Sequence, residues 1–465
     1  MPAGSRWLKN LKLFQKLLIF QVFFFFFFFV FLLIYFYLFR IYNKDIAFIS
    51  IYFLICSILT ISEMHQAKTD GLLFLTVNAA NLLIFELVRT NKAKNFLKIV
   101  FWIILAFGVL IKGPIIFIFA LIPLFVFSLL QRNNYFKQIW SWLGLLSFLV
   151  ITLPWFIAIT IKSSGVFWYE SVVFDLFNKL KSGQESHGFP PGYYFILIFI
   201  FFWPGSIFFP SVLINSIKKW RVLFLDSKED CFLSLWFLVP LIIYEIVPTK
   251  LPHYILPSYS ALSILIAKHL FSINFEYEKL KYTTIPLIIF PCLFIGLLLF
   301  SIYNYSNPDP FFWLLIFIFL IFTFYLLSIN LKKNLKKLLV FVGVFQLCVY
   351  LSLIYFLIPK MNVLWISENI AKIVDRNKND VDEILNYGFN EPSLIFLTSH
   401  KSKKIDPHIL KENTIFSKKI MYIVSSEYSE IFFKNPKYSD FKLVEKFQGF
   451  NYSKGRNMSF EIYKN

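Results

Sequence analysis

Four short groups of charged and aromatic residues interrupt an otherwise apolar sequence. The first group runs from Glu63 to Asp70 and includes His65 and Lys68. Carboxylates and imidazoles can hold or move protons, whereas an ammonium group donates to phosphate oxygens. Asp70 taken alone is explained equally well as a cap that opposes the dipole at the start of a helix. The position of this group therefore decides little by itself.

The second and fourth groups each contain a lysine at the end of an apolar run. Lys112 could bind a phosphate or extend its ammonium group to the membrane surface, and the second reading is favoured for a single lysine. The fourth group, residues 248–257, brings Lys250, His253 and Tyr254 into one short turn. A turn that only connects two helices seldom carries a cation, an imidazole and a phenol together. These side chains could hold an anionic lipid head group, with Lys250 and Tyr254 donating to phosphate oxygens.

The third group lies in a long polar segment, residues 162–192, and continues to Tyr194. Loops longer than about 12–15 residues are commonly functional. Near its end stand Glu185 and His187. A histidine is usually structural, but beside an acid at the mouth of a cavity it is a candidate metal ligand or acid/base group.

The elements that must position these groups are membrane helices. Of the 465 residues, 58% are hydrophobic and 16% are charged, against about 45–50% and 25% in an average soluble domain. This composition excludes a water-soluble fold. A helix needs roughly 20 apolar residues to cross a bilayer, and twelve segments qualify: 17–39, 46–61, 71–88, 97–111, 114–130, 139–161, 193–213, 231–247, 254–272, 283–303, 310–329 and 338–358.

The distribution of positive charge predicts the orientation of these helices. The net charge of +19 could indicate a nucleic-acid partner, but the lysines and arginines stand in small groups between apolar runs, and we predict no nucleic acid. The loops between the predicted helices fall into two alternating sets, one on each side of the membrane. One set holds eighteen Lys and Arg residues and the other holds six. Lys and Arg favour the cytoplasmic side. The poorer set, which includes the loops 62–70, 162–192 and 248–253, is therefore predicted outside.

Both ends of the chain differ from the membrane part. The chain is predicted to comprise a transmembrane domain, residues 1–360, and a small extracytoplasmic α/β domain, residues 361–465. In the latter, 366–375 follows a helical pattern, whereas 393–397 and 420–424 read as strands. The basic first sixteen residues break the charge rule, because the helix count places them outside. This anomaly predicts a preceding helix that the sequence lacks.

The order of the motifs resembles that of lipid-linked-sugar glycosyltransferases of the GT-C fold, in the branch of bacterial aminoarabinose transferases and dolichyl-phosphate-mannose protein mannosyltransferase-like proteins. The resemblance covers nearly the whole chain from about residue 5. Each motif is short, but the five stand in order on the predicted outer face. They are Ala67-Lys-Thr-Asp70, Lys112-Gly-Pro114, Pro154-Trp-Phe156, His187 to Tyr194, and Lys250 to Pro257.

The resemblance implies transfer of a sugar, with inversion, from a polyprenyl phosphate to a lipid (lipid A-like) or protein acceptor. The enzyme would lie in the bacterial cytoplasmic (inner) membrane, among membrane lipids, and act at its outer face. Asp70 and His187 would be catalytic, and His187 matches a histidine that binds a divalent metal ion or lies near the phosphate. Substrate- or phosphate-binding residues would be Lys68, Lys112, Glu185, Tyr194, Lys250, His253 and Tyr254.

The sequence also departs from the family pattern. Members begin with a further helix and an exported loop that carries an Asp-Glu pair, taken as the base, and then a Glu-Lys-Pro-Pro-like element, and the sequence contains neither. A truncated, inactive remnant or a scaffold is therefore an alternative function. A lipid or solute transporter is a weaker one, because transporters usually place polar residues near the bilayer midplane in two related halves.

Overall fold

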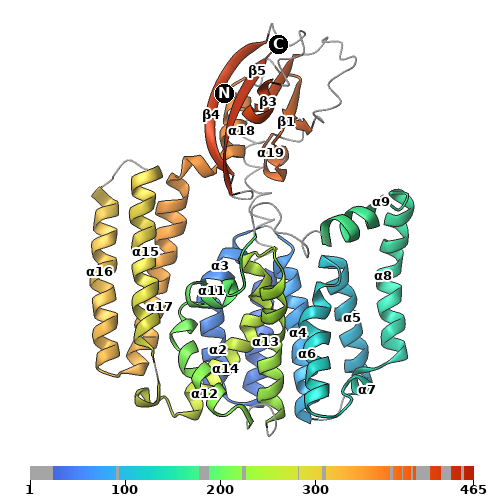
Figure 1. Cartoon of the computed structure of the whole chain (residues 1–465), viewed down its shortest axis with the longest axis vertical. Helices are drawn as coiled ribbons and strands as arrows, with labels where there is room; N and C mark the ends of the chain where they lie inside the picture. Colours follow the sequence, from blue (N-terminus) through green and yellow to red (C-terminus); the bar gives the residue numbers. More distant parts are fainter. Residues whose placement is uncertain are drawn as a thin grey trace, which may run out of the picture. The chain divides into compact units, whose positions relative to one another are not determined.

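The structure is a computed structural model of the whole chain (Figure 1). It describes residues 25–66, 68–90, 94–176, 188–221, 227–280, 282–305, 310–377, 381–389, 391–398, 402–404, 419–430, 441–451 and 455–464. The chain divides into two compact units, Met1–Ile295 with Phe317–Val349, and Gly296–Ile316 with Tyr350–Asn465. The domain boundary predicted at residue 360 stays a prediction.

The first unit is a bundle of helices. In chain order these are Phe25–Ile41, α2 (Lys44–Cys56), α3 (Ile58–Met64), α4 (Asp70–Thr90), α5 (Asn95–Lys112), α6 (Ile115–Leu130), α7 (Phe136–Ile139), α8 (Trp142–Lys162), α9 (Val166–Trp168), the π-helix η1 (Tyr169–Leu176), α11 (Tyr193–Phe201), α12 (Phe209–Lys218), α13 (Lys228–Ile246), the 3-10 helix η4 (Pro252–Ser258) and α14 (Tyr259–Ser272). Three further helices, α15 (Thr284–Tyr305), α16 (Pro310–Leu331) and α17 (Leu335–Leu351), are shared between the two units.

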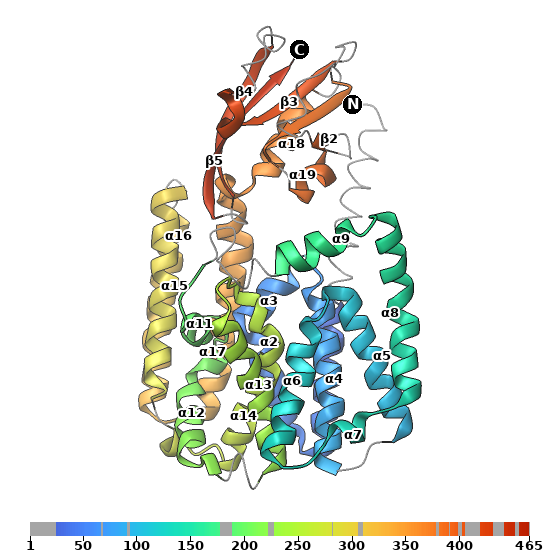
Figure 2. The same cartoon turned by 45° about the vertical axis from the view of Figure 1, so that its right-hand side comes forward.

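Helix α4 forms the centre of the first unit. It contacts α5, α6, α13 and η4, and most of its residues are buried (Figures 1 and 2). At its first residue Asp70 is buried, whereas near its other end Glu86 is half-buried and Arg89 and Thr90 are exposed. The fold therefore protects the end of α4 that carries Asp70 more than the end that carries Arg89.

Local sequence explains where several helices stop. The backbone bends by 64° between α2 and α3, where the Ser57 hydroxyl accepts from the backbone N–H of Thr60 and caps the new helix. Helix α5 ends at Gly113, whose φ of 64° suits glycine, and Pro114 follows at once. The predicted span 193–213 is interrupted between α11 and α12, since Pro204 lacks the N–H that a continuous helix needs.

The described residues include seven helices long and apolar enough to cross a membrane, or eight if the bent pair of α2 and α3 is one span. The helix Phe25–Ile41 and α6 are apolar but shorter. Each of the twelve predicted segments overlaps a helix. The all-α polytopic architecture is thus confirmed, whereas the count of twelve spans stays a prediction.

The second unit contains a small α/β fold. Its five-stranded sheet has the order β2-β1-β3-β5-β4, with β1 (Glu383–Tyr387), β2 (Ser402–Lys404), β3 (Ile420–Ser425), β4 (Lys442–Asn451) and β5 (Arg456–Lys464). Strand β1 pairs in parallel with β2 and β3, whereas β5 pairs antiparallel with β3 and β4. Two helices, α18 (Ile366–Arg376) and α19 (Pro392–Leu397), share one hydrophobic core with the sheet (Figure 2).

The second unit confirms the predicted helix at 366–375 and the predicted strand at 420–424. The prediction of a strand at 393–397 is wrong, because these residues form α19. Pro392 occupies the first turn of α19, where a missing N–H costs nothing, and the Thr398 hydroxyl donates to the Leu394 carbonyl at its end. Leu394 alone is buried in this helix, so the apolar run is a short helix on the sheet rather than a strand within it.

Candidate active site

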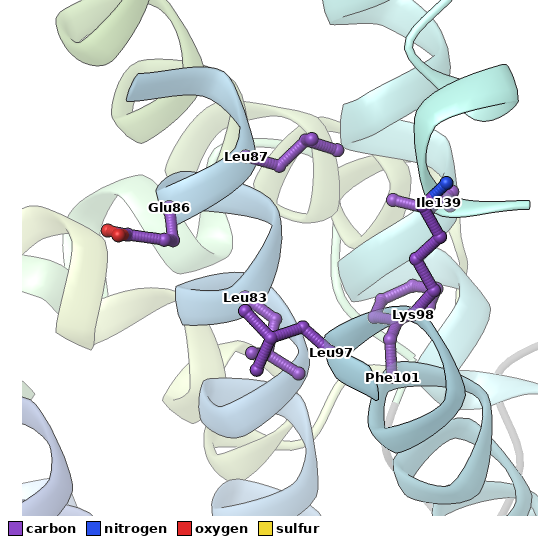
Figure 3. A pocket seen from close by; sticks show the side chains of 7 residues that line it. All are labelled: Leu83, Glu86, Leu87, Leu97, Lys98, Phe101 and Ile139. Carbon is purple, nitrogen blue, oxygen red and sulfur yellow. The ribbon is translucent and has the colours of Figure 1, made fainter. Parts of the chain in front are cut away.

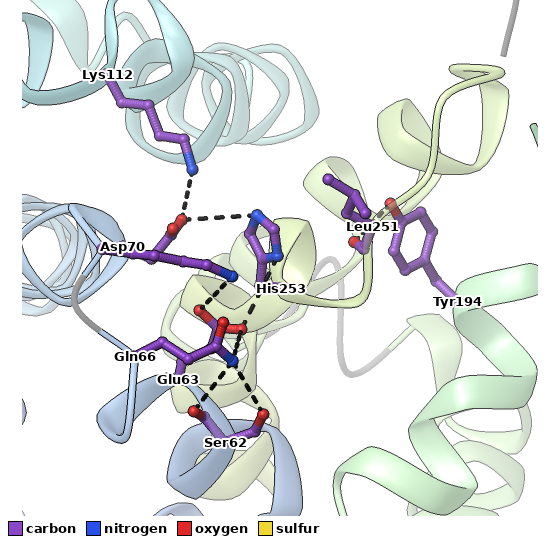
Figure 4. A network of polar contacts seen from close by, with 9 residues as sticks. Ser62, Glu63, Gln66, Asp70, Lys112, Tyr194, Leu251 and His253 are labelled. Atoms are coloured by element: carbon purple, nitrogen blue, oxygen red, sulfur yellow. Dashed lines mark hydrogen bonds and ion pairs between the residues drawn. The ribbon is translucent and has the colours of Figure 1, made fainter. Parts of the chain in front are cut away.

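Three chain segments meet at the end of α4 that begins with Asp70. Asp70 is the first residue of α4 and Lys112 is the last residue of α5, and their Oδ1 and Nζ atoms lie 2.5 Å apart (Figure 4). The third segment is η4, which carries His253. The Lys112-Gly113-Pro114 corner explains the geometry, since it ends α5 where the ammonium group reaches Asp70. Lys112 therefore pairs with a specific carboxylate rather than only extending toward the membrane surface.

His253 lies between two carboxylates. Its Nε2 atom is 3.9 Å from Oδ1 of Asp70, and its Nδ1 atom is 3.9 Å from Oε1 of Glu63 (Figure 4). These separations exceed the length of a hydrogen bond, but the three groups are close enough to interact electrostatically. The His253 side chain is 12% exposed, so it is still reached from outside the cluster.

Glu63 is the most deeply buried charged group of this cluster, with a side-chain exposure of 5%. Its Oε1 atom accepts from Gln66 Nε2 at 3.4 Å, and its Oε2 atom lies 3.9 Å from Lys68 Nζ. No described group donates a hydrogen bond to Oε2. A buried carboxylate with an unmet oxygen is costly, which is typical of a site built for function rather than for stability. We call Glu63, Lys68, Asp70, Lys112 and His253 the site cluster.

Lys250 has a different environment from the one expected of a phosphate ligand. It is 1% exposed, and its Nζ donates to the carbonyls of Tyr244, Glu245 and Val247 at 3.0, 2.7 and 2.5 Å. All three ammonium protons are thus used at the C-terminal end of α13, where a cation also opposes the helix dipole. Burial lowers the pKa of Lys250. The phosphate-binding role of Lys250 stays a prediction, and the observed contacts are those of a residue that shapes the turn.

The motifs around Tyr194 and Lys250 are bound to one another. The Tyr194 hydroxyl donates to the Leu251 carbonyl at 3.1 Å, and its ring lies 5.9 Å from Lys250 Nζ (Figure 4). The Glu245 carboxylate accepts the backbone N–H groups of Gly192 and Phe195 at 2.8 and 3.0 Å and so caps α11. These contacts hold the turn that presents His253.

The structure thus brings together some of the predicted residues. Lys68, Asp70, Lys112 and His253 form one cluster. In the adjoining turn the Tyr254 ring packs edge-on against His253 and at a tilt to Tyr244. The predicted Pro154-Trp-Phe156 element instead lies within α8, where the Trp155 ring packs against Phe167. The sequence analysis gave no role to Glu245, since an acid inside an apolar helix carries no sign of the backbone that it caps.

Two predicted residues, Glu185 and His187, lie outside the described residues. Among the residues that are described, no group of three or more His, Cys, Asp or Glu side chains is placed to hold a metal ion. The divalent metal ion and the role of His187 in binding it stay predictions.

A second charged region lies at the other end of α4. Glu86 accepts from the hydroxyl of Tyr37 at 2.8 Å and pairs with Arg40 and Arg89 at 3.1 and 3.2 Å. Nearby, Lys268 pairs with Asp230 at 2.5 Å and with Glu229 at 3.7 Å, and Tyr42 donates to Glu229. We call Tyr37, Arg40, Tyr42, Glu86, Arg89, Glu229, Asp230 and Lys268 the opposite cluster. Asp70 and Glu86 are 16 positions apart on α4, so about 24 Å separates the two clusters.

The small pocket beside Glu86 is not a second polar site. Five of its seven lining residues are apolar, and the other two are Glu86 and Lys98. Figure 3 shows the Glu86 carboxylate pointing away from Leu87 and Ile139. The Glu86 carboxylate pairs with Arg40 and Arg89 instead.

Comparison with known proteins defines the class. Residues 9–157 match the family model described as dolichyl-phosphate-mannose-protein mannosyltransferase. The structure superposes on the crystal structure of ArnT from Cupriavidus metallidurans bound to undecaprenyl phosphate with a TM-score of 0.71, at 15% identity and over 97% of this chain and 84% of that one. The chain has the GT-C fold of the aminoarabinose transferases in a multi-pass membrane protein, and the resemblance drawn from the motifs is confirmed.

Particular relatives agree with this class. The undecaprenyl phosphate-alpha-4-amino-4-deoxy-L-arabinose arabinosyl transferase 2 of Proteus mirabilis is 26% identical over 231 residues, which is 49% of this chain and 40% of the relative. An uncharacterised protein of Aquifex aeolicus is 27% identical over 206 residues, 44% of each chain. The chain aligns with less than half the length of these curated relatives.

Proposed function

We propose that this protein is a glycosyltransferase that moves a sugar from a polyprenyl-phosphate donor to an acceptor at the outer face of the cytoplasmic membrane. One observation carries the proposal: the acid, lysine and histidine of three separate motifs meet in the site cluster. The shared fold with ArnT, whose structure holds undecaprenyl phosphate, supports a lipid phosphate as the ligand of this cluster.

The site cluster offers groups for both halves of this reaction. An acceptor hydroxyl attacks the anomeric carbon, the bond from that carbon to the phosphate oxygen breaks, and the phosphate leaves with the electron pair. Lys112 and His253 are the groups that we assign to the phosphate, because cations stabilise the charge that develops on it. Asp70 is the carboxylate that we assign to the hydroxyl proton, since it is less buried than Glu63.

Glu63 is proposed as a positioning residue. Its carboxylate lies behind His253 on the side away from Asp70, 3.9 Å from Nδ1. A fixed charge there favours the ring orientation that turns Nε2 toward Asp70 and Lys112. Lys250 acts in the same way on the backbone, because it holds the α13 end from which the His253 turn departs.

Finer features of the proposal follow the relatives. A lipid A-like glycolipid is the proposed acceptor, with a protein hydroxyl as the alternative, and the small α/β domain is proposed to lie outside the cytoplasm. The Proteus mirabilis relative is an aminoarabinose transferase by name, so an amino sugar is the first donor to test.

The test compares glycolipid masses between cells with and without the gene. The expected result is a glycolipid heavier by one glycosyl unit only when the gene is present, and its loss in the Asp70→Asn variant. The matched control is Glu278→Gln, an exposed acid paired with Lys333 far from the site cluster in sequence. Identical glycolipids in both strains would reject a lipid acceptor. Lipids that change sides of the membrane without changing mass would favour a transporter.

A further inference from the structure

The first unit also contains an apolar groove that lies apart from the site cluster. Residues of α12, α13 and α14, together with Trp220, line this groove of about 280 Å³. Its lining is nearly all apolar, with Val212, Phe237 and Leu262 among the contacts and two serines as the polar members. The α13 part of the lining, Ser234 to Leu238, lies toward the beginning and middle of that helix, and its α14 part includes Leu265, close in sequence to Lys268 of the opposite cluster. The groove is therefore nearer the opposite cluster than the site cluster.

Positive side chains gather where α12 ends at this groove. Ile217 and Trp220 line the groove and are 64% and 52% exposed, and Lys218, Lys219 and Arg221 stand beside them with exposed side chains. The Arg221 guanidinium lies 5.4 Å from the Trp220 ring. An exposed tryptophan next to cations is typical of a membrane interface.

The neighbouring acids do not neutralise these cations. Glu229 and Asp230, at the start of α13, are paired with Lys268 and Tyr42 in the opposite cluster. Among the residues that the structure describes, none forms an ion pair with Lys218, Lys219 or Arg221. Three cations without an ion pair among the described residues, at the end of an apolar groove, are complementary to a molecule with an acyl chain and an anionic head group.

We propose that this groove binds an anionic glycerophospholipid, with an acyl chain between α12 and α13 and the head group on Lys218, Lys219 and Arg221. The polyprenyl-phosphate donor is a poorer fit, because its phosphate must reach the site cluster. The lipid would tie α12 to α13 and α14 in the same way that Glu245 ties α11 to α13 on the other side of the interruption at Pro204.

The experiment measures phosphatidylglycerol and phosphatidylcholine retained by the purified full chain, by native mass spectrometry from detergent. We expect the wild type to retain phosphatidylglycerol preferentially. In the variant Lys218→Gln/Lys219→Gln/Arg221→Gln the ratio of retained phosphatidylglycerol to phosphatidylcholine should fall by about tenfold or more. Each cation near an anionic surface contributes about fivefold to binding. Ser216→Trp, which fills the groove from a half-buried position, should reduce retention of both lipids.

The matched control is Lys332→Gln/Lys336→Gln/Lys337→Gln, which removes three exposed lysines at another helix turn. This control should keep the preference of the wild type. Thermal unfolding of every variant checks that the fold is retained. Equal retention of the two lipids by the wild type, an unchanged preference in the triple variant at α12, or retention of undecaprenyl phosphate in place of phosphatidylglycerol would each overturn the proposal.

Discussion

The two ends of α4 carry charged clusters of similar composition, but the charged groups are paired more closely in one cluster than in the other. In the opposite cluster, Glu86 meets two arginines and a tyrosine within 3.2 Å, and Lys268 meets two acids. In the site cluster, His253 stands 3.9 Å from both of its acids, and one oxygen of Glu63 has no hydrogen-bond donor among the described residues. The first arrangement satisfies its charges within the protein, which is what a structural role requires.

The difference teaches how to separate structural from functional charges in a membrane protein. Both clusters would be equally conspicuous in a sequence, because both place acids and cations beside apolar runs. In the opposite cluster Glu86, Glu229 and Asp230 each lie within 3.7 Å of a cation. In the site cluster Asp70 is 2.5 Å from Lys112, whereas Glu63 lies 3.9 Å from both Lys68 and His253. An incoming phosphate would share Lys112 with Asp70 and would meet His253, which stands 3.9 Å from both of its acids. In the opposite cluster it would compete with acids that already lie within 3.2 Å of Arg40, Arg89 and Lys268.

The proposed difference between the clusters is tested most strongly by neutralising an acid of the site cluster and comparing the result with an acid of the opposite cluster. Asp70→Asn should reduce sugar transfer roughly 10²–10⁴-fold, because it removes the proposed base and the partner of Lys112. Transfer is measured with a purified polyprenyl-phosphate sugar and glycolipid acceptor. A variant that transfers sugar at the normal rate would remove Asp70 from the active site.

Lys250→Met tests the part of the turn that supports the site cluster. Three carbonyls at the end of α13 would lose their donor, which should cost about 1–3 kcal/mol of stability. Thermal unfolding in detergent measures this loss. If Lys250 binds phosphate directly instead, the midpoint of unfolding would stay near that of the wild type while donor affinity falls.

Glu63→Gln should have a smaller effect that is confined to the site cluster. The change keeps the shape of the side chain but removes the charge behind His253, so the KM for the donor should rise roughly fivefold with a smaller change in kcat. Glu63→Asp, which restores the charge, should recover part of the affinity. A loss of kcat with an unchanged KM would argue that Glu63 takes part in the chemistry.

Glu86→Gln should have the smallest effect on transfer. It weakens the pairs with Arg40 and Arg89, which should cost about 1 kcal/mol of stability, while the rate per folded molecule stays at the wild-type value. Activity normalised to the monodisperse fraction measures this rate. A tenfold loss of rate would show that the opposite cluster is more than a support.

Sequence could predict the fold class and the helical segments, because apolar runs are local properties. A shared site for Lys68, Asp70, Lys112 and His253 was implied only by the resemblance of the ordered motifs to the family, since their contacts depend on tertiary packing. It could not predict where the Lys250 ammonium points, since the choice between a ligand and three carbonyls of α13 depends on tertiary packing. For the same reason Glu245 gave no signal as the cap of α11. The run 393–397 was mistaken for a strand because a short apolar segment fits either structure.

The most direct test of the central claim is the binding of undecaprenyl phosphate to two lysine variants, Lys112→Gln in the site cluster and Lys268→Gln in the opposite cluster. Thermal unfolding is followed with increasing lipid, because a ligand that binds the native state raises the midpoint. The account predicts that the lipid stabilises the wild type and Lys268→Gln but not Lys112→Gln. Equal stabilisation of both variants would contradict the assignment of the phosphate to the site cluster.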